Sequence, residues 1–258
     1  MNDHLPGEED KPSRLTAREL ARYDRQLLFP GFGEQGQERL KRARALVVGA
    51  GGLGSPAAIY LACAGIGHLQ IVDFEAVELS NLNRQILHWE QDVAKKKTVS
   101  ASRKLTGMNS DITVEPLCLE VAEENAADLV AGADVVLDCL DNMRTRFILN
   151  RACHQKKVPL IHAGVNGVVG EVTTIIPGET PCLECLFPPH LEKKGKFPIF
   201  GATAGLIASL QCLEAIKLLS GVGKLLNGRM LYVDGGNMDF TVIPIDRRKD
   251  CRVCGQAS

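Results

Sequence analysis

The residues that most clearly indicate chemistry form a glycine-rich run directly after a short apolar segment. The run is Gly49-Ala50-Gly51-Gly52-Leu53-Gly54. Where a strand turns into a helix, backbone N–H groups can bind phosphate, and glycine lets the ligand approach the backbone closely. Asp73 ends the next apolar segment, about 20 residues after the last glycine, which is the spacing of an acid that binds ribose hydroxyls. The predicted nucleotide-binding residues are Gly49, Gly51, Gly52, Gly54 and Asp73.

The glycine motif alone does not identify the chemistry, and by itself it favours a nicotinamide or flavin oxidoreductase. The residues beyond it change that interpretation. Asn81 and Arg84 follow the second apolar segment, at the edge of an open α/β sheet where ligands bind. Residues 95–97 are all lysine and stand at the start of an expected helix, where cations are unfavourable unless they pair with an anion. Phosphate would be such an anion, although a solvated run of lysines is the common alternative.

Asp141 closely follows another apolar segment of the expected sheet. A carboxylate in that position beside a phosphate-binding loop suits Mg²⁺, which prefers oxygen ligands. The alternative is that Asp141 or Asn142 caps the next helix. Arginine, lysine and a metal-binding carboxylate around one nucleotide suit phosphate chemistry, because they neutralise charge on transferring phosphates. Hydride transfer needs none of them.

Four of the nine cysteines form two C-x₂-C pairs, Cys182 with Cys185 and Cys251 with Cys254. Four thiolates in two such pairs are typical of a tetrahedral structural zinc site. A thioredoxin-type redox pair is the alternative, but it expects a strand–helix junction, which neither pair resembles. A four-cysteine site has no open coordination position, so the expected role is structural. We expect the other five cysteines to be packing residues.

The alternation of apolar and polar segments predicts the elements that must position these residues. The expected strands are 44–49, 68–73, 111–117, 134–139 and 158–163, and the expected helices are 53–65, 95–107, 123–131 and 143–156. Near-continuous apolar strands that alternate with helices predict a Rossmann-like α/β fold, with a mostly parallel sheet and helices on both faces.

The pattern changes after about residue 166. We expect an added strand over 171–177, a long buried helix over 203–220, and a closing strand pair at 230–233 and 240–245. These strands and the zinc knuckle would extend the sheet. Near the start of the chain, Thr16 and Glu19 predict a capping box that begins a short helix. We expect a disordered tail over 1–14 and a single domain over 15–258, with a nucleotide-binding core at about 43–165 and a C-terminal part at about 166–258.

Composition limits the classes of partner and the location. The chain has 258 residues, of which 45% are hydrophobic, and its 30 Lys and Arg against 31 Asp and Glu give a net charge of −1. This balance offers no electrostatic case for nucleic acid or an anionic membrane as a partner. No apolar run approaches the ~20 residues that span a bilayer, and the polar N-terminus has no signal-peptide core. The expected location is therefore the cytoplasm.

Several spaced motifs together resemble the ThiF/MoeB/HesA family, the bacterial relatives of ubiquitin-activating enzymes. The motifs are ARYDRQ, VVGAGGLGSP, IVDFEAVELSNLNRQ, LDCLDN, PCLECL, SLQCLEAIKLLSG and CRVCGQ, and the match runs from about Leu15 to Gln256. The resemblance implies an ATP-dependent adenylyltransferase. Such an enzyme activates the C-terminal Gly-Gly carboxylate of a small ubiquitin-like sulfur-carrier protein as an acyl-adenylate and releases pyrophosphate. A sulfurtransferase or cysteine desulfurase would then supply sulfur for molybdopterin- or thiamin-type cofactor biosynthesis.

Matching positions in the family give roles to individual residues. The four glycines would line the nucleotide and Asp73 would bind the ribose. Asn81 and Arg84 would contact the triphosphate, and Lys97 aligns with the family's phosphate lysine. Arg84 and Lys97 are thus expected both to bind ATP and to assist catalysis. The C-terminal part would bind the carrier protein.

The resemblance also implies that Asp141 binds Mg²⁺ and that Arg25 reaches across a homodimer to the partner subunit's ATP. Two departures from the family pattern matter. Ala94 replaces a glycine that often precedes the phosphate lysine, which weakens the choice among the three lysines. No cysteine lies between Cys185 and Cys212, where some members have one for a covalent intermediate. We therefore expect direct transfer of the adenylate to an external sulfur donor.

Two other functions stay open from the sequence. One is an adenylating enzyme of the same superfamily that acts on a peptide or a tRNA. The other, from a different class, is a Rossmann oxidoreductase that uses NAD or FAD.

Overall fold

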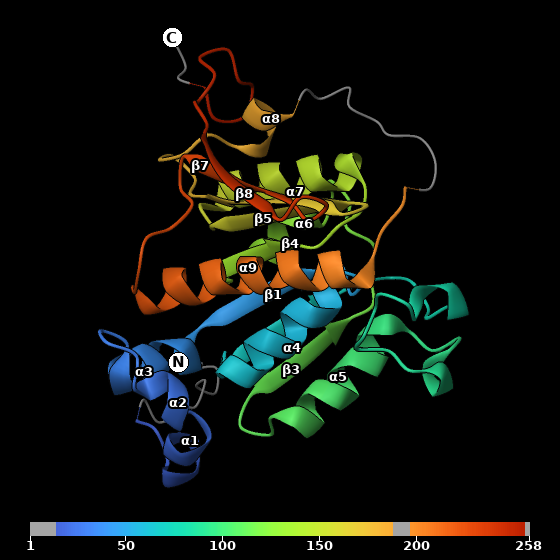
Figure 1. Cartoon of the computed structure of the whole chain (residues 1–258), viewed down its shortest axis with the longest axis vertical. Helices are drawn as coiled ribbons and strands as arrows, with labels where there is room; N and C mark the ends of the chain where they lie inside the picture. Colours follow the sequence, from blue (N-terminus) through green and yellow to red (C-terminus); the bar gives the residue numbers. More distant parts are fainter. Residues whose placement is uncertain (1–13, 188–196, 256–258) are drawn as a thin grey trace, which may run out of the picture.

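A computed structural model describes residues 14–187 and 197–255, which form one eight-stranded sheet with helices on both faces (Figure 1). The strands are β1 (Arg44–Val48), β2 (His68–Val72), β3 (Thr113–Leu117), β4 (Val135–Asp138), β5 (Leu160–Asn166), β6 (Val169–Ile175), β7 (Arg229–Asp234) and β8 (Asp239–Pro244). The order across the sheet is β3-β2-β1-β4-β5-β6-β7-β8. Pairing is parallel from β3 to β5 and antiparallel from β5 to β8. The predicted mostly parallel sheet with added C-terminal strands is confirmed.

The central strand β1 shows why helices cover both faces. Its side chains alternate, with Ala45 and Val47 in one core and Leu46 and Val48 in the other. The first core is covered by α3 (Gly33–Arg42), α4 (Gly54–Ala64), α5 (Lys97–Met108) and α9 (Gly201–Ser220), and the second by α6 (Ala126–Val130) and α7 (Met143–Lys156). An apolar strand without polar alternation needs this double cover, because both of its faces must leave water.

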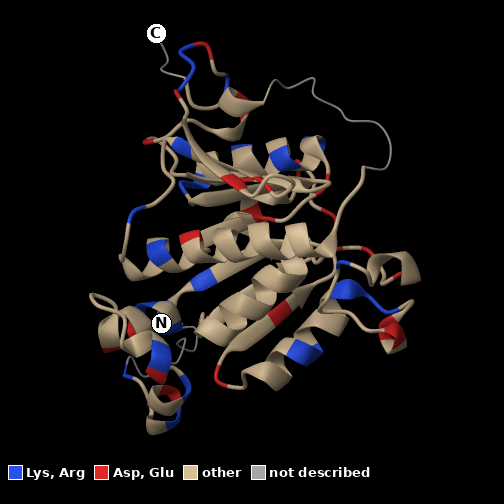
Figure 2. Ribbon diagram, in the orientation of Figure 1, with Lys and Arg blue, Asp and Glu red and all other residues tan. Residues whose placement is uncertain are grey.

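Helix α9 is long and apolar enough to cross a membrane if only length and composition are considered. The expectation that no apolar run approaches this length was therefore wrong. The helix packs on α4 and on strands β4, β5 and β6, and a core helix passes the same test. Figure 2 shows that α4 has no charged residue and that α9 has charges only toward its C-terminal end, as expected for two helices at the centre of the molecule.

The N-terminal helices form as the capping pattern predicts. The Thr16 hydroxyl accepts from the Glu19 N–H at 3.2 Å, and the Glu19 carboxylate accepts from the Thr16 N–H at 2.8 Å. This box begins α1 (Ala17–Arg22), which is followed by the single-turn α2 (Asp24–Leu27). The expected tail, apart from Arg14, lies outside the described residues.

The helices differ from the sequence-based expectation in three main respects. The helix expected over 95–107 begins at Lys97, because Lys96 is its N-cap and has a non-helical ψ of 133°. The helix expected over 123–131 is shorter than predicted and forms only over Ala126–Val130, as α6. Helix α3 was not predicted, since its buried positions are Gly36, Gln37 and Leu40, which give almost no apolar stripe.

Candidate functional site

The glycine loop joins β1 to α4 at the carboxyl edge of the parallel strands. The chain runs outward from β1 to β2 and β3, and then returns to β4 on the other side of β1. Open α/β sheets bind ligands at such a switch point, because the connections on either side diverge there. The predicted phosphate loop therefore stands where this fold class binds nucleotides.

The four glycines of the loop differ in what requires them. A Cβ on Gly49, whose φ is 99°, would lie 2.6 Å from the Cys139 carbonyl oxygen, and one on Gly54 would lie 1.7 Å from that of Gly49. The packing of the protein itself therefore requires these two. The nearest atoms to a Cβ on Gly51 and on Gly52 are 3.7 and 3.6 Å away, which is ordinary contact. Glycine at these two positions suits close approach by a ligand rather than the fold.

The segment after β2 packs along the glycine loop. The Arg84 side chain lies 3.6 Å from the Cβ position of Gly52, and the Gln85 amide lies 3.7 Å from that of Gly51. Arg84 is half-buried and donates from Nη1 to the Ser80 carbonyl at 2.9 Å. Gln85 is buried, and its Oε1 accepts no hydrogen bond within the described part of the chain. Arg84 was among the predicted nucleotide-binding residues, whereas Gln85 was not, because only proximity in space links it to the loop.

Asp73 contacts the loop directly. Its Oδ2 accepts from the Ala50 N–H at 2.8 Å, and its Oδ1 accepts from the Glu75 N–H at 2.8 Å. A carboxylate has about four acceptor sites, so Asp73 can still accept from a ribose hydroxyl. Asn81 is buried, and its Oδ1 accepts from the Glu78 N–H at 3.0 Å, which orders the turn before Arg84.

The structure distinguishes the three consecutive lysines. Lys95 and Lys96 are exposed, whereas the Lys97 side chain is only 3% exposed. The Lys97 ammonium pairs with Glu75 Oε2 at 2.5 Å, just beyond the end of β2. Of the three, Lys97 is therefore the one held in place at the start of α5, against the segment that follows β2.

Asp141 and Asn142 separate into two roles. The Asn142 side chain accepts from the Thr145 N–H at 2.9 Å and caps α7. Asp141 is exposed, and its carboxylate accepts only a long 3.5 Å bond from Asn142 within the described residues. Its oxygens are thus available to a hard cation such as Mg²⁺.

A buried charged group orders the chain just before Asp141. Arg146 donates to the carbonyl oxygens of Leu140 at 2.5 Å and Ala163 at 2.9 Å, which ties this loop to β5. Asp138 accepts from His162 Nδ1 at 2.7 Å. Burial favours the neutral acid, but Arg146 and His162 outweigh it and hold the pKa of Asp138 below its usual range. Asp141 therefore follows a rigid strand end.

Arg25 does not lie at this site within its own chain. Its side chain is 93% exposed on α2. Gln26 on the same helix donates to the Ala64 carbonyl, at the far end of α4 from the glycine loop. With a rise of about 1.5 Å per residue, the 11 residues of α4 separate the two by about 16 Å. Arg25 can contact ATP only if that ATP is bound to another subunit.

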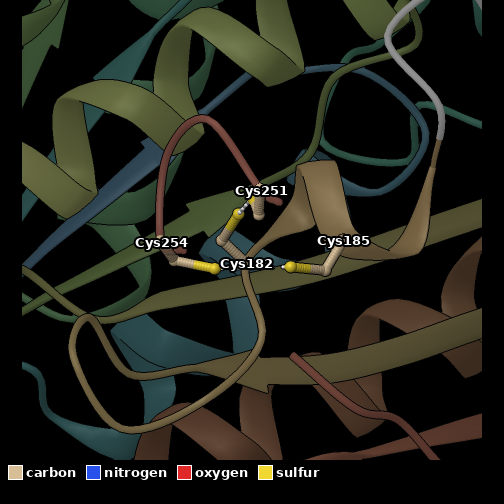
Figure 3. A group of neighbouring side chains, drawn as sticks. All are labelled: Cys182, Cys185, Cys251 and Cys254. Atoms are coloured by element: carbon tan, nitrogen blue, oxygen red, sulfur yellow. Dashed lines mark hydrogen bonds between the residues drawn. The ribbon is translucent and has the colours of Figure 1, made fainter. Parts of the chain in front are cut away.

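The four paired cysteines meet beyond the sheet, around the short helix α8 (Leu183–Leu186), as Figure 3 shows. Their sulfur atoms all lie within 4.8 Å of one another. Tetrahedral zinc with bonds of about 2.3 Å needs sulfurs about 3.8 Å apart, so the four fit one ion. Burial opposes ionisation of Cys251, but backbone N–H groups at Cys254 and Val253 lower the pKa of its thiol to about 7. The cluster can hold a metal ion, and it brings residues 251–254 against α8.

Comparison with known proteins gives the family. Residues 23–253 match the ThiF family. The chain is 42% identical over 248 residues to the SAMP-activating enzyme E1 of Haloferax volcanii, covering 94% of this chain and 91% of that protein. It is 42% identical to the heterocyst protein HesA of Trichormus variabilis, with coverage of 93% and 91%. It is 41% identical to the adenylyltransferase and sulfurtransferase MOCS3-1 of Drosophila pseudoobscura pseudoobscura. That match covers 94% of this chain but 55% of the relative.

Solved structures agree with this assignment. Escherichia coli MccB with ATP superposes with a TM-score of 0.83 at 26% identity, covering 91% of this chain and 75% of that one. MccB in complex with N-formylated MccA gives a TM-score of 0.83 at 25% identity, with the same coverage.

Proposed function

The chain belongs to the ThiF family and is an adenylyltransferase that uses ATP, and we propose that its substrate is the C-terminal Gly-Gly carboxylate of a small ubiquitin-like sulfur-carrier protein. The product would be a carrier acyl-adenylate, made with release of pyrophosphate. The similarity to the SAMP-activating enzyme supports this substrate class most strongly. A sulfurtransferase or cysteine desulfurase would then provide sulfur for a molybdopterin- or thiamin-type pathway.

The arrangement of charges suits this reaction. A carboxylate oxygen attacks the α-phosphorus, a bond forms there, and the bond from that phosphorus to the β-phosphate oxygen breaks with release of pyrophosphate. Negative charge builds on the phosphoryl oxygens, and Arg84 and Lys97 would neutralise it. The nucleophile is already ionised at neutral pH, so the reaction needs no general base.

Two metal ions complete the proposal. Asp141 would bind Mg²⁺, because its exposed carboxylate oxygens suit a hard cation. The ion would stabilise negative charge on the phosphates. Zinc would be the metal of the cysteine cluster, since four thiolates are its typical structural ligands. With no open coordination position, this zinc would stabilise the fold and take no part in the reaction.

Mass spectrometry of the carrier tests the substrate class. The protein is incubated with ATP, Mg²⁺ and a panel of ubiquitin-like carriers that end in Gly-Gly, each paired with the same carrier lacking its last glycine. An AMP adduct on one full-length carrier and none on its truncated control would support the proposal. Adenylate on no carrier, from protein that binds ATP, would contradict it.

An adenylating enzyme that acts on a peptide or a tRNA is the second candidate. The fold likeness to MccB, solved in complex with N-formylated MccA, is the observation that supports this candidate. An AMP adduct on a peptide or a tRNA, offered in place of the carriers in the same mass-spectrometric assay, would support it. The oxidoreductase alternative is set aside, because the chain is an adenylyltransferase.

We also propose a homodimer located in the cytoplasm. The exposed Arg25, whose Nε lies 3.8 Å from Asp24 Oδ2, is followed by Leu28 and Phe29, which are 68% and 58% exposed, so an apolar surface adjoins this arginine. A thiolate zinc site suits a reducing compartment. Mixing inactive Arg25→Ala and Asp141→Ala chains tests the dimer. If Arg25 acts in trans, half of the dimers are mixed and each has one intact site, so about a quarter of wild-type activity returns. No recovery after subunit exchange would contradict it.

A further inference from the structure

A buried chain of polar side chains ends at the glycine loop. Lys104 forms an ion pair with Asp92 and donates to Ser100 Oγ at 2.9 Å. Ser100 Oγ lies 3.0 Å from His88 Nδ1, and His88 Nε2 lies 3.0 Å from the Ala50 carbonyl oxygen. All four side chains are less than 10% exposed. None of them belongs to the residues assigned to ATP or metal above.

The donors and acceptors of these groups allow one direction of donation along this series of hydrogen bonds. A carbonyl oxygen only accepts, so the proton of His88 is on Nε2 and its Nδ1 accepts from the Ser100 hydroxyl. The Ser100 oxygen in turn accepts from the Lys104 ammonium. That ammonium also lies 4.4 Å from the centroid of the Trp89 ring, which helps to fix its position. The arrangement therefore specifies one neutral tautomer of His88 in one orientation.

The charges around His88 favour the same state. Burial, the first cause, and then the charges of Lys104 and Lys97 lower the pKa of His88 below its usual value, while the bond to Ala50 and the charge of Asp73 oppose this. Neutral His88 is thus the favoured form at neutral pH.

The bond at Ala50 controls a group that faces the ligand. The N–H of Ala50 donates to Asp73. Its carbonyl accepts from His88 at 3.0 Å and, over a longer 3.3 Å, from Ser55 Oγ, so both sides of this residue are fixed. The Ala50 carbonyl and the Gly51 N–H belong to one planar trans peptide and point in opposite directions. The Gly51 N–H donates to no protein group within residues 14–187 and 197–255. Holding the carbonyl therefore aims a free backbone donor away from His88.

We propose that His88 is a positioning residue for ATP. Its neutral imidazole, oriented through Ser100 by the Asp92–Lys104 pair, holds the Ala50–Gly51 peptide so that the Gly51 N–H donates to a phosphate oxygen. This inference rests on the glycine loop being the ATP site. It makes ATP affinity depend on a histidine that does not touch the nucleotide.

Two substitutions at one position test the proposal by calorimetric ATP titration. His88→Phe keeps the ring volume and removes the donor, and losing this one hydrogen bond raises the Kd for ATP by about tenfold. His88→Gln places an amide N–H near the position of Nε2 and stays within about threefold of the wild type at pH 7.5. His68→Gln, at the opposite edge of the sheet, is the control and leaves the Kd unchanged.

Rescue by the variant that keeps the donor separates positioning from general stability. If His88→Phe does not fold, His88→Asn takes its place, because its amide is one methylene too short to reach the Ala50 carbonyl, and it raises the Kd by a similar factor. An unchanged Kd in a folded variant that lacks the donor, or an equal rise in His88→Gln, would overturn the inference. A wild type that binds no ATP would instead contradict the proposed function itself.

Discussion

Lys97→Met distinguishes a functional lysine from two solvated neighbours. Lys97 is the buried member of the three, and its ammonium pairs with Glu75 beside the glycine loop. Methionine keeps an unbranched side chain of similar length and removes only the charge. If that charge neutralises the phosphate in the transition state, kcat for adenylylation falls by about 10²–10³-fold, equivalent to about 2.7–4 kcal/mol.

The same substitution should lower the free energy of unfolding only slightly. The Glu75 side chain is 55% exposed, so water already screens its pair with Lys97. Loss of such a pair costs about 0–1 kcal/mol, which lowers the Tm by about 4 °C at most in a chain of this size. Activity should therefore fall far more than stability.

Carrier-dependent ATP–pyrophosphate exchange at saturating substrates, beside a thermal scan, measures both quantities. The matched control is Lys96→Met, which removes an exposed ammonium that donates to the Phe74 carbonyl at 2.8 Å. This control should retain kcat within about twofold, as surface substitutions usually do. A loss below about tenfold in Lys97→Met, or an equal loss in the control, would refute the assignment.

Three further changes test the loop, the backbone and the metal site. Gly54→Ala would place a Cβ 1.7 Å from the Gly49 oxygen and should lower the Tm by more than about 6 °C. The nearest atom to a Cβ on Gly51 is 3.7 Å away, so Gly51→Ala should keep the Tm within about 2 °C. The same variant should nevertheless weaken ATP binding measured by calorimetry. Equal stability losses would contradict this distinction. Ala94→Gly removes a left-handed alanine at φ 70°, which relieves a strain of about 1–2 kcal/mol. Glycine also gives the unfolded chain more freedom, which offsets about 0.4–1 kcal/mol of that gain. The Tm should therefore rise by about 1–3 °C in a thermal scan, and a decrease would argue against strain. Elemental analysis should find one zinc per chain, and Cys254→Ser should lose zinc and lower the Tm, whereas full zinc content in that variant would contradict a four-cysteine site.

The parts of the fold that followed from the sequence are those with a strong local pattern. The strand ending at Val48 is apolar on both faces and could only be a covered, parallel strand, and the helix over 143–156 was predicted at its observed bounds. Helix α3 lacked an apolar stripe, so periodicity did not reveal it. The start of α5 was misplaced by two residues, because nothing in a run of three lysines marks Lys96 as the N-cap.

The candidate site divides in the same way. The glycines, Asp73 and the cysteine pairs have short, fixed spacings that a single sequence reveals. The competition between Asp141 and Asn142 for the cap of α7 needed coordinates, which show Asn142 as the cap. His88 could not be identified, because its partners Ala50 and Ser100 lie 38 and 12 residues away and form no motif.

ATP–pyrophosphate exchange with Mg²⁺ and a Gly-Gly carrier measures the proposed adenylyl transfer itself. We expect label exchange that requires one carrier, occurs with the wild type, and is lost in Asp141→Ala while the Tm stays unchanged, because Asp141 is exposed and contributes little to the fold. Exchange that persists in Asp141→Ala, or none with any carrier, peptide or tRNA by a protein that binds ATP, would contradict it.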